Sequence, residues 1–252
     1  MARTDGRDGN QLRPPSAELG VLRRCDGSCR FTQGGTEVVA GVYGPAVPRY
    51  SRDEDYTGPA VEVVVRSGTG AALGSERLLE AMLAGATRAI VVRELYPNTA
   101  LSGTVHVLHG DGAVTAAALN ALTLALVDAG VALRGLACGA VVAAQGSTLL
   151  LDPTEAEEDA AQGACFLALL EGAADEKDGA ADDAVGAGGG AGDGAGADRI
   201  LVMDSWGRCD KELQLKMTRA AVSAAKAAAN FARVVLDRRT ALQERNTPME
   251  TG

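Results

Sequence analysis

Residues 105–131 read VHVLHGDGAVTAAALNALTLALVDAGV, and this stretch carries the clearest structural signal in the chain. The run from Leu101 to Leu108 is rich in apolar and β-branched residues, which predicts a strand. From Val114 to Ala129 apolar residues recur at helical spacing, which predicts a helix, and Gly130 is placed to end it. A strand that passes through a short polar turn into an apolar helix is typical of a domain that mixes strands and helices.

Further elements are predicted on both sides of this stretch. Asp26-Gly27 marks a turn over residues 23–27, and Ser75 is placed to cap a helix that runs to about Val92. Apolar and β-branched runs predict strands at 28–33, 36–42, 61–66, 136–144, 148–151, 165–170 and 200–203, and a long helix runs from Asp210 to about Arg245. The predicted fold is α/β (α+β), with mixed sheets packed with helices and a long C-terminal helix.

The composition is that of a globular protein with one unusual segment. The chain has 252 residues, 46% hydrophobic and 3% aromatic, with a formal charge of −9. The segment 171–198 holds most of this acidity, together with nine Gly and nine Ala, and is expected to be a disordered surface insert. We therefore expect a single domain over 1–252, nearly neutral outside the insert. The low aromatic share argues against a general single-strand binder that stacks bases on rings.

Two classes of protein are not expected. The first 15 residues are polar and lack the apolar region of a signal peptide, and polar residues interrupt the apolar stretch from Ala113 to Ala144, so no membrane segment is predicted. The five cysteines have no regular spacing, and Cys25 and Cys29 lack the further ligands of a zinc site. We expect reduced thiols and no metal.

Several motifs together resemble the RNase PH family. They are DGNQLRPPSAELGVL at the start, RRCDGSCRFTQGGTEVVAGVYGP after it, the stretch quoted above, and then LACGAVVA and TLLLDPTEAEEDAA. The similarity covers roughly residues 9–170 and resumes from 199 to about 245. Within the family, the motifs are most similar to the small single-domain ring subunits of the eukaryotic RNA exosome. The resemblance therefore implies an RNase PH-like domain.

Active members of this family are phosphate-dependent exoribonucleases, and the resemblance implies where their chemistry would lie. Their phosphate cradle is a Gly-Thr-Arg-Thr-type turn at a helix N-terminus, where free N–H groups favour an anion. Here its Thr falls on Val114 and its Arg on Thr115, after Gly112, which leaves a degenerate phosphate site without a guanidinium. An upstream Arg falls near 71–74, where none is present, and the acidic position falls on Ala164. We expect no catalytic residues and no cofactor.

Other candidate sites are weighed against simpler interpretations. Arg49, Tyr50 and Arg52 are the best candidates for RNA contact, because two guanidiniums around a ring suit a single strand, although a solvated loop is the alternative. His106 and His109 are expected to point to opposite faces of a strand, and Asp111 to tether the turn. The acidic residues of 155–159 are expected to form a solvated loop rather than a Mg²⁺ site. Alternatively, Thr154 with Glu157 fits a capping box that starts a short helix.

The predicted function follows from the resemblance and the missing groups. We expect a non-catalytic structural subunit of the RNA exosome ring that guides RNA through the channel and supports 3′–5′ processing and degradation. Its partners would be other RNase PH-like subunits in a hexameric ring, S1/KH-type cap subunits and RNA, in the nucleus, nucleolus and cytoplasm, with no membrane. The alternative is a residual metal-dependent or phosphorolytic 3′–5′ exoribonuclease that acts as a homodimer.

Overall fold

The structure is a computed structural model, and it describes residues 3, 6–48, 57–68, 74–146, 148–172 and 198–246. A five-stranded sheet has the order β1-β2-β3-β5-β4, and a four-stranded sheet has the order β7-β6-β8-β9. The strands are β1 Pro15–Leu19, β2 Gly27–Gln33, β3 Thr36–Ala46, β4 Ala60–Ser67, β5 Ala100–His109, β6 Leu136–Gln145, β7 Thr148–Leu151, β8 Gly163–Glu171 and β9 Arg199–Gly207. The helices are α1 Gly74–Ile90, α2 Val114–Asp128, α3 Glu155–Asp159 and α4 Lys211–Asn246, with a 3-10 turn η2 at Arg93–Leu95.

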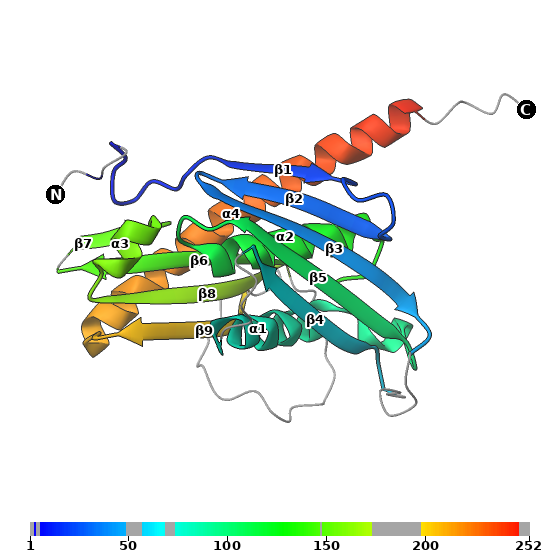
Figure 1. Cartoon of the computed structure of the whole chain (residues 1–252), viewed down its shortest axis with the longest axis horizontal. Helices are drawn as coiled ribbons and strands as arrows, with labels where there is room; N and C mark the ends of the chain where they lie inside the picture. Colours follow the sequence, from blue (N-terminus) through cyan, green and yellow to red (C-terminus); the bar gives the residue numbers. More distant parts are fainter. Residues whose placement is uncertain are drawn as a thin grey trace, which may run out of the picture.

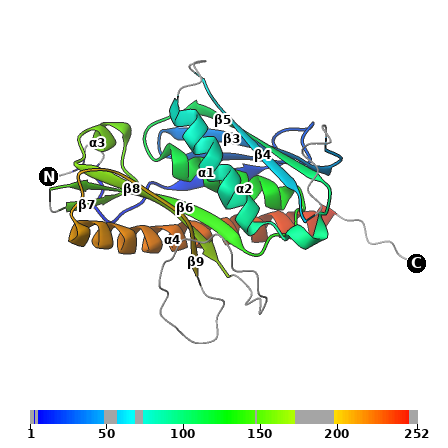
Figure 2. The ribbon, with the colours of Figure 1, turned by 90° about the horizontal axis from the view of Figure 1, so that it is seen from below.

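The elements stack in layers, as Figures 1 and 2 show: the five-stranded sheet, then α1 and α2, then the four-stranded sheet, then α4. All strand pairs are antiparallel except β4 and β5, which run parallel on either side of the crossover helix α1. Every residue of α2 from Ala116 to Leu126 is buried. A helix that is apolar all round needs cover on all sides, and α2 obtains it by lying between the two sheets.

Small residues let α4 lie close to the four-stranded sheet. Met217, Ala221, Ala224 and Ala225 of α4 are buried against a cluster that includes Cys165, Leu167 and Leu169 of β8. On the other face of the same sheet, Phe166, Ala168 and Leu170 join the larger core around α2. The two-fold alternation along β8 thus divides its side chains between two cores. Among the described helices, none is long and apolar enough to cross a membrane.

The predicted fold class is confirmed, with corrections at a few boundaries. Gly130 follows α2 with a positive φ of 72°, as predicted for the residue that ends it. Ser75 lies inside α1 rather than before it, and α1 ends at Ile90 because Val91 bridges to Leu133. Strand β1 was not predicted. All five cysteines belong to the described part of the chain, and none of them forms a disulfide.

The boundaries predicted for the acidic insert 171–198 were too wide. Strand β8 extends through Glu171, which pairs with Leu136 of β6 and forms an ion pair with Arg233 of α4 at 3.4 Å. At the other end, Asp198 forms an ion pair with Lys226 of α4 at 2.6 Å. Both end residues are therefore part of the folded domain. Residues 173–197, where the disorder is predicted, lie outside the described residues.

Candidate functional site

The turn between β5 and α2 holds the residues predicted to form a degenerate phosphate site. Gly112 has a φ of 74°, and a Cβ there would lie 2.4 Å from the carbonyl oxygen of Pro153, so a side chain is not accommodated. Ala113 also adopts a left-handed φ, 50°, and is buried. Thr36 Oγ1 donates to the Gly112 carbonyl oxygen at 2.7 Å and accepts the N–H of Asp111 at 3.1 Å. The turn is thus fixed by its neighbours before α2 begins.

Arg13 ties this turn to the segment after β7. Its side chain is 4% exposed and donates to both carboxylate oxygens of Asp152, at 2.8 and 2.6 Å. The same guanidinium donates to the carbonyl oxygen of Asp111 at 2.6 Å, and its NH1 lies 3.5 Å from the Asp111 carboxylate. Asp111 therefore tethers the turn, as predicted. Because the Arg13 guanidinium is fully engaged inside the protein, it offers no free charge to a bound anion.

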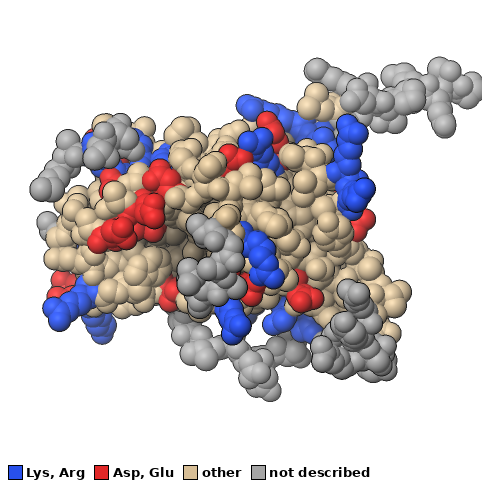
Figure 3. All heavy atoms as spheres, in the orientation of Figure 1, with Lys and Arg blue, Asp and Glu red and all other residues tan. Residues whose placement is uncertain are grey.

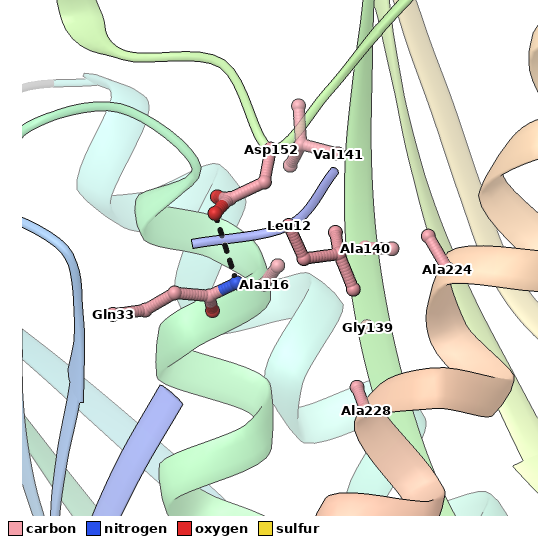
Figure 4. Close-up of a pocket in the computed structure, with 9 residues that line it drawn as sticks. All are labelled: Leu12, Gln33, Ala116, Gly139, Ala140, Val141, Asp152, Ala224 and Ala228. Carbon is pink, nitrogen blue, oxygen red and sulfur yellow. Dashed lines mark hydrogen bonds between the residues drawn. The ribbon is translucent and has the colours of Figure 1, made fainter. Parts of the chain in front are cut away.

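Asp152 is the centre of a buried polar cluster. It is 2% exposed and also accepts the backbone N–H of Arg13 at 2.9 Å and Nε2 of Gln33 at 3.0 Å. Figure 4 shows Gln33 and Asp152 beside a small cavity that is closed on other sides by α2, β6 and α4. The cavity volume is about 10 Å³, enough for one water molecule and for no substrate. This cavity therefore admits no substrate, and a larger pocket of about 270 Å³, lined by Arg13, Gln33 and Phe231 among others, adjoins it.

The acidic residues of 155–159 are not a loop, so that prediction was wrong, whereas the predicted short helix is confirmed; Glu155 and Asp159 are exposed, and Glu157 and Glu158 are half-buried. They form the short helix α3, whose start has the predicted capping box of Thr154 and Glu157. Glu157 accepts two hydrogen bonds from Arg3, at 2.9 and 2.8 Å, and the N–H of Thr154 at 3.0 Å. Arg3 is itself buried. Arg3 and Glu157 are far apart in the sequence, so the local sequence around Glu157 does not predict their contact.

A carboxylate of the protein occupies the N-terminal end of α2. Glu158 Oε1 accepts the N–H of Ala113, the residue before the first turn of the helix, at 2.8 Å. Burial raises the pKa of Glu158 above its ordinary value, against this hydrogen bond and the nearby Arg13. By contrast, the hydrogen bond from Arg3 lowers the pKa of Glu157. A helix N-terminus attracts anions, and here an internal carboxylate already takes that position.

The side chains at the start of α2 add no positive charge. Val114 and Thr115 are half-buried, so the site offers one hydroxyl where the resemblance implies an arginine. Ala164, at the predicted acidic position, is fully buried in an apolar cluster with Ala143 and Leu150. Its partner across the sheet is Trp206 of β9, which is 42% exposed. Neither a proton donor nor a cation therefore stands at these positions.

The two histidines belong to the strand that leads into this turn. His106 and His109 both lie on β5 and are exposed. Within the part of the chain that the structure describes, no three potential ligands of the His, Cys, Asp and Glu types come together to hold a metal. Arg49, Tyr50 and Arg52 lie outside the described residues, so their contact with RNA stays a prediction. Residues 71–73, near the position where the resemblance implies an upstream arginine, also lie outside the described residues.

Sequence reasoning missed the residues that organise the site. Arg3, Arg13 and Asp152 were not predicted to interact, although Arg13 lies in the LRPP motif and Asp152 begins DPTEAEE. The separations of Arg13 and Arg3 from their acidic partners are 139 and 154 residues. A charged residue between apolar neighbours, such as Asp152 after LLL, was the available signal, because an ion that interrupts a buried strand needs a partner.

Comparisons with known proteins agree with this geometry. The family described as 3′ exoribonuclease family, domain 1, matches residues 11–132. A protein of Arabidopsis thaliana named exosome complex exonuclease RRP46 homolog is 36% identical over 157 residues, which cover 62% of this chain and 65% of the relative. The mouse exosome complex component RRP41 is 32% identical over 178 residues, which cover 67% of this chain and 73% of the relative. The chain spans just under two thirds of the length of the first curated relatives that it matches.

Solved structures share the fold. The crystal structure of rice (Oryza sativa) Rrp46 matches with a TM-score of 0.77 and 27% identity, and covers 93% of this chain and 100% of that chain. An archaeal exosome core matches with a TM-score of 0.70, covering 92% of this chain and 91% of that chain, at 17% identity, which shows the fold alone. The arrangement of two sheets around α2 is thus that of a known class of domain.

Proposed function

The chain belongs to the RNase PH family of 3′ exoribonucleases, and we propose that it serves as a non-catalytic ring subunit of an RNA exosome. Relatives from Arabidopsis thaliana and mouse carry the words exosome complex in their names, and the rice Rrp46 structure covers nearly the whole chain. In this proposal the partners are other RNase PH-like subunits in a hexameric ring, S1/KH-type cap subunits and RNA. The protein would work in the nucleus, nucleolus and cytoplasm.

One observation supports the lack of catalysis above the others. The N–H of Ala113 at the start of α2 is bonded to the protein's own Glu158, and the next two side chains are Val114 and Thr115. Phosphorolysis develops negative charge on the attacking phosphate and the transferred phosphoryl group, and needs cationic groups aimed at that charge. A carboxylate at the same place repels the phosphate instead.

The assembly is tested by purification from cells. A tagged full-length chain should co-purify with other RNase PH-like subunits and S1/KH-type proteins, identified by mass spectrometry. A tagged, unrelated protein of similar size is the control. Recovery of the tagged chain alone, at a size that matches a monomer or a homodimer in gel filtration, would contradict the proposed role in a ring.

The alternative is a residual 3′–5′ exoribonuclease that acts as a homodimer, and the word exonuclease in the names of two plant relatives favours it. The purified chain is incubated with 5′-labelled RNA, with and without inorganic phosphate, Mg²⁺ and EDTA. Our proposal expects no shortening of the RNA in any condition. Phosphate-dependent release of nucleoside diphosphates would contradict it, and so would Mg²⁺-dependent cleavage that is lost in Glu158→Ala.

A further inference from the structure

The loop between β1 and β2, residues 20–26, carries two neighbouring arginines that have no acidic partner among the described residues. Arg23 and Arg24 are both exposed, and neither forms an ion pair with any described residue. Several other exposed arginines have an acidic partner, as Arg30 has Glu37 at 2.7 Å. An exposed guanidinium without a carboxylate keeps its full capacity for a phosphate.

Hydrogen bonds hold this loop in one conformation. The N–H of Gly20 donates to the Ser28 carbonyl oxygen at 2.9 Å, and the N–H of Leu22 donates to Ser28 Oγ at 2.9 Å. On the other side, the N–H of Asp26 donates to the Val42 carbonyl oxygen at 3.0 Å, and Asp26 Oδ2 accepts the N–H of Gly44 at 2.8 Å. A loop that is ordered before binding loses less entropy when a ligand arrives.

Tyr43 lies beside this loop with a large part of its ring free. It is on β3, next to the Gly44 that Asp26 holds, and it is 44% exposed. A hydrogen bond to the thiol of Cys25 raises the pKa of Tyr43, and Arg24 is close enough to act against that shift. Packing also places the loop against this strand, because a Cβ on Gly41, two residues before Tyr43, would meet the Cys25 thiol and Leu22.

We propose that Arg23, Arg24 and Tyr43 form a contact site for single-stranded RNA on the surface of this subunit. The guanidiniums would bind phosphates, and the ring would stack against a base. The two arginines and the exposed ring are the evidence for a binding site for a polyanion. The choice of RNA as that polyanion rests on the proposed function. Tyr43 is a single ring, so the site would serve as one contact along a path rather than a complete binding groove.

The charge distribution agrees with this assignment. Figure 3 shows basic side chains standing together at the end of the molecule where the 20–26 loop lies in Figure 1, and the largest group of acidic side chains over α3 toward the other end. Val21 and Leu22, at 40% and 39% exposure, adjoin the pair of arginines. Their apolar surface makes docking of a protein the competing outcome of the test.

The test measures the binding of a 5′-fluorescein 12-mer of oligouridylate to the full chain by fluorescence anisotropy over a range of salt concentrations. Arg23→Ala/Arg24→Ala should weaken binding by at least about tenfold near 0.1 M salt and reduce the magnitude of the salt slope by about 1.4, or 0.7 for each lost phosphate contact. Tyr43→Ala should weaken binding by about fivefold or more, whereas Tyr43→Phe, which keeps the ring, should bind almost as the original chain does.

Lys216→Ala/Arg219→Ala on α4 is the matched control, because it also removes two exposed cations that lack an ion pair among the described residues. It should change the affinity by less than twofold. Inorganic polyphosphate is the second ligand, and its binding should respond to the loop arginines but not to Tyr43→Ala. Absence of RNA binding by the original chain overturns the proposal, as does an equal loss in the control variant. If the loop variants bind RNA normally but recover protein partners less well, the proposal is also overturned, and a docking surface for a protein is favoured instead.

The two proposals fail separately. If the purified complex contains the ring subunits but the loop variants bind RNA normally, the contact site is refuted and the ring subunit stands. If the chain recovers no exosome subunits yet loses RNA binding in the loop variants, the ring proposal is refuted and the contact site stands.

Discussion

Asp152→Asn tests whether the buried pair of Arg13 and Asp152 holds the candidate site together. The substitution keeps the shape of the side chain, and Asn tolerates the left-handed φ of 51° at this position better than most residues. It removes the negative charge that two nitrogens of the Arg13 side chain contact at 2.6 and 2.8 Å, in a place where both side chains are less than 5% exposed. A guanidinium would then remain buried without its strongest counter-charge.

The structure sets the expected size of the effect. Removing one partner of a buried ion pair costs about 3–5 kcal/mol, because the remaining charge has lost its compensation. The exposed pair of Arg30 and Glu37, with side-chain exposures of 45% and 20%, is the matched control. Glu37→Gln should cost less than about 1 kcal/mol, since water screens both charges.

Urea unfolding followed by circular dichroism gives the free energy of unfolding for each variant. The double variant Arg13→Met/Asp152→Asn removes the stranded charge and should be more stable than Asp152→Asn alone. It also provides a folded comparison if the single variant is too unstable to purify. A loss of less than about 1 kcal/mol in Asp152→Asn, or a double variant that is less stable than the single one, would refute the reasoning.

Three further predictions concern stability, each measured by urea unfolding. Gly112→Ala should cost at least about 2 kcal/mol because its Cβ meets a carbonyl oxygen, whereas Gly130→Ala, also at positive φ but in open space, should cost about 1 kcal/mol; equal costs would contradict the steric argument. The pKa of Glu157 is lowered in the folded state by Arg3, so its stabilisation is present above the ordinary pKa of a glutamate and is lost as the pH falls through the lowered value. The original chain should therefore exceed Glu157→Gln in stability at neutral pH and lose that advantage in acid; a pH-independent difference would contradict the ion pair. Phe31→Ala should cost about 3–5 kcal/mol, since Phe31 is 2% exposed, and a cost below 1 kcal/mol would show that the site collapses without a cavity.

Local patterns predicted much of the fold because the elements are locally consistent. The helix at 114–129 and the strands around it follow from periodicity and from glycines at turns, and the structure confirms them within a few residues. Strand β1 was missed because its residues, PSAEL, begin with a proline and include no β-branched or aromatic side chain, although their burial alternates along the strand. Its place at the edge of the sheet is decided by pairing with β2, which is a tertiary contact.

The resemblance drew attention to the start of α2 and to Ala164, and the contacts around them were not predicted. The structure places Val114 at the first position of the helix and Ala164 in an apolar cluster on β8, so their joint role stays a prediction. The interpretation of 155–159 as a solvated loop failed because a run of acidic residues looks the same whether its partners are water or distant arginines. Glu157 is half-buried because it binds Arg3, and no residue near Glu157 in the sequence indicates this contact.

The engagement of Arg3 by Glu157, 154 residues later, has a consequence for how the protein is made. Arg3 cannot reach its final position until Glu157 has been translated, so it remains without this partner while the strands between the two residues assemble. A chaperone that stays bound at Arg3 should therefore delay the formation of this ion pair, and with it the completion of the fold around α3.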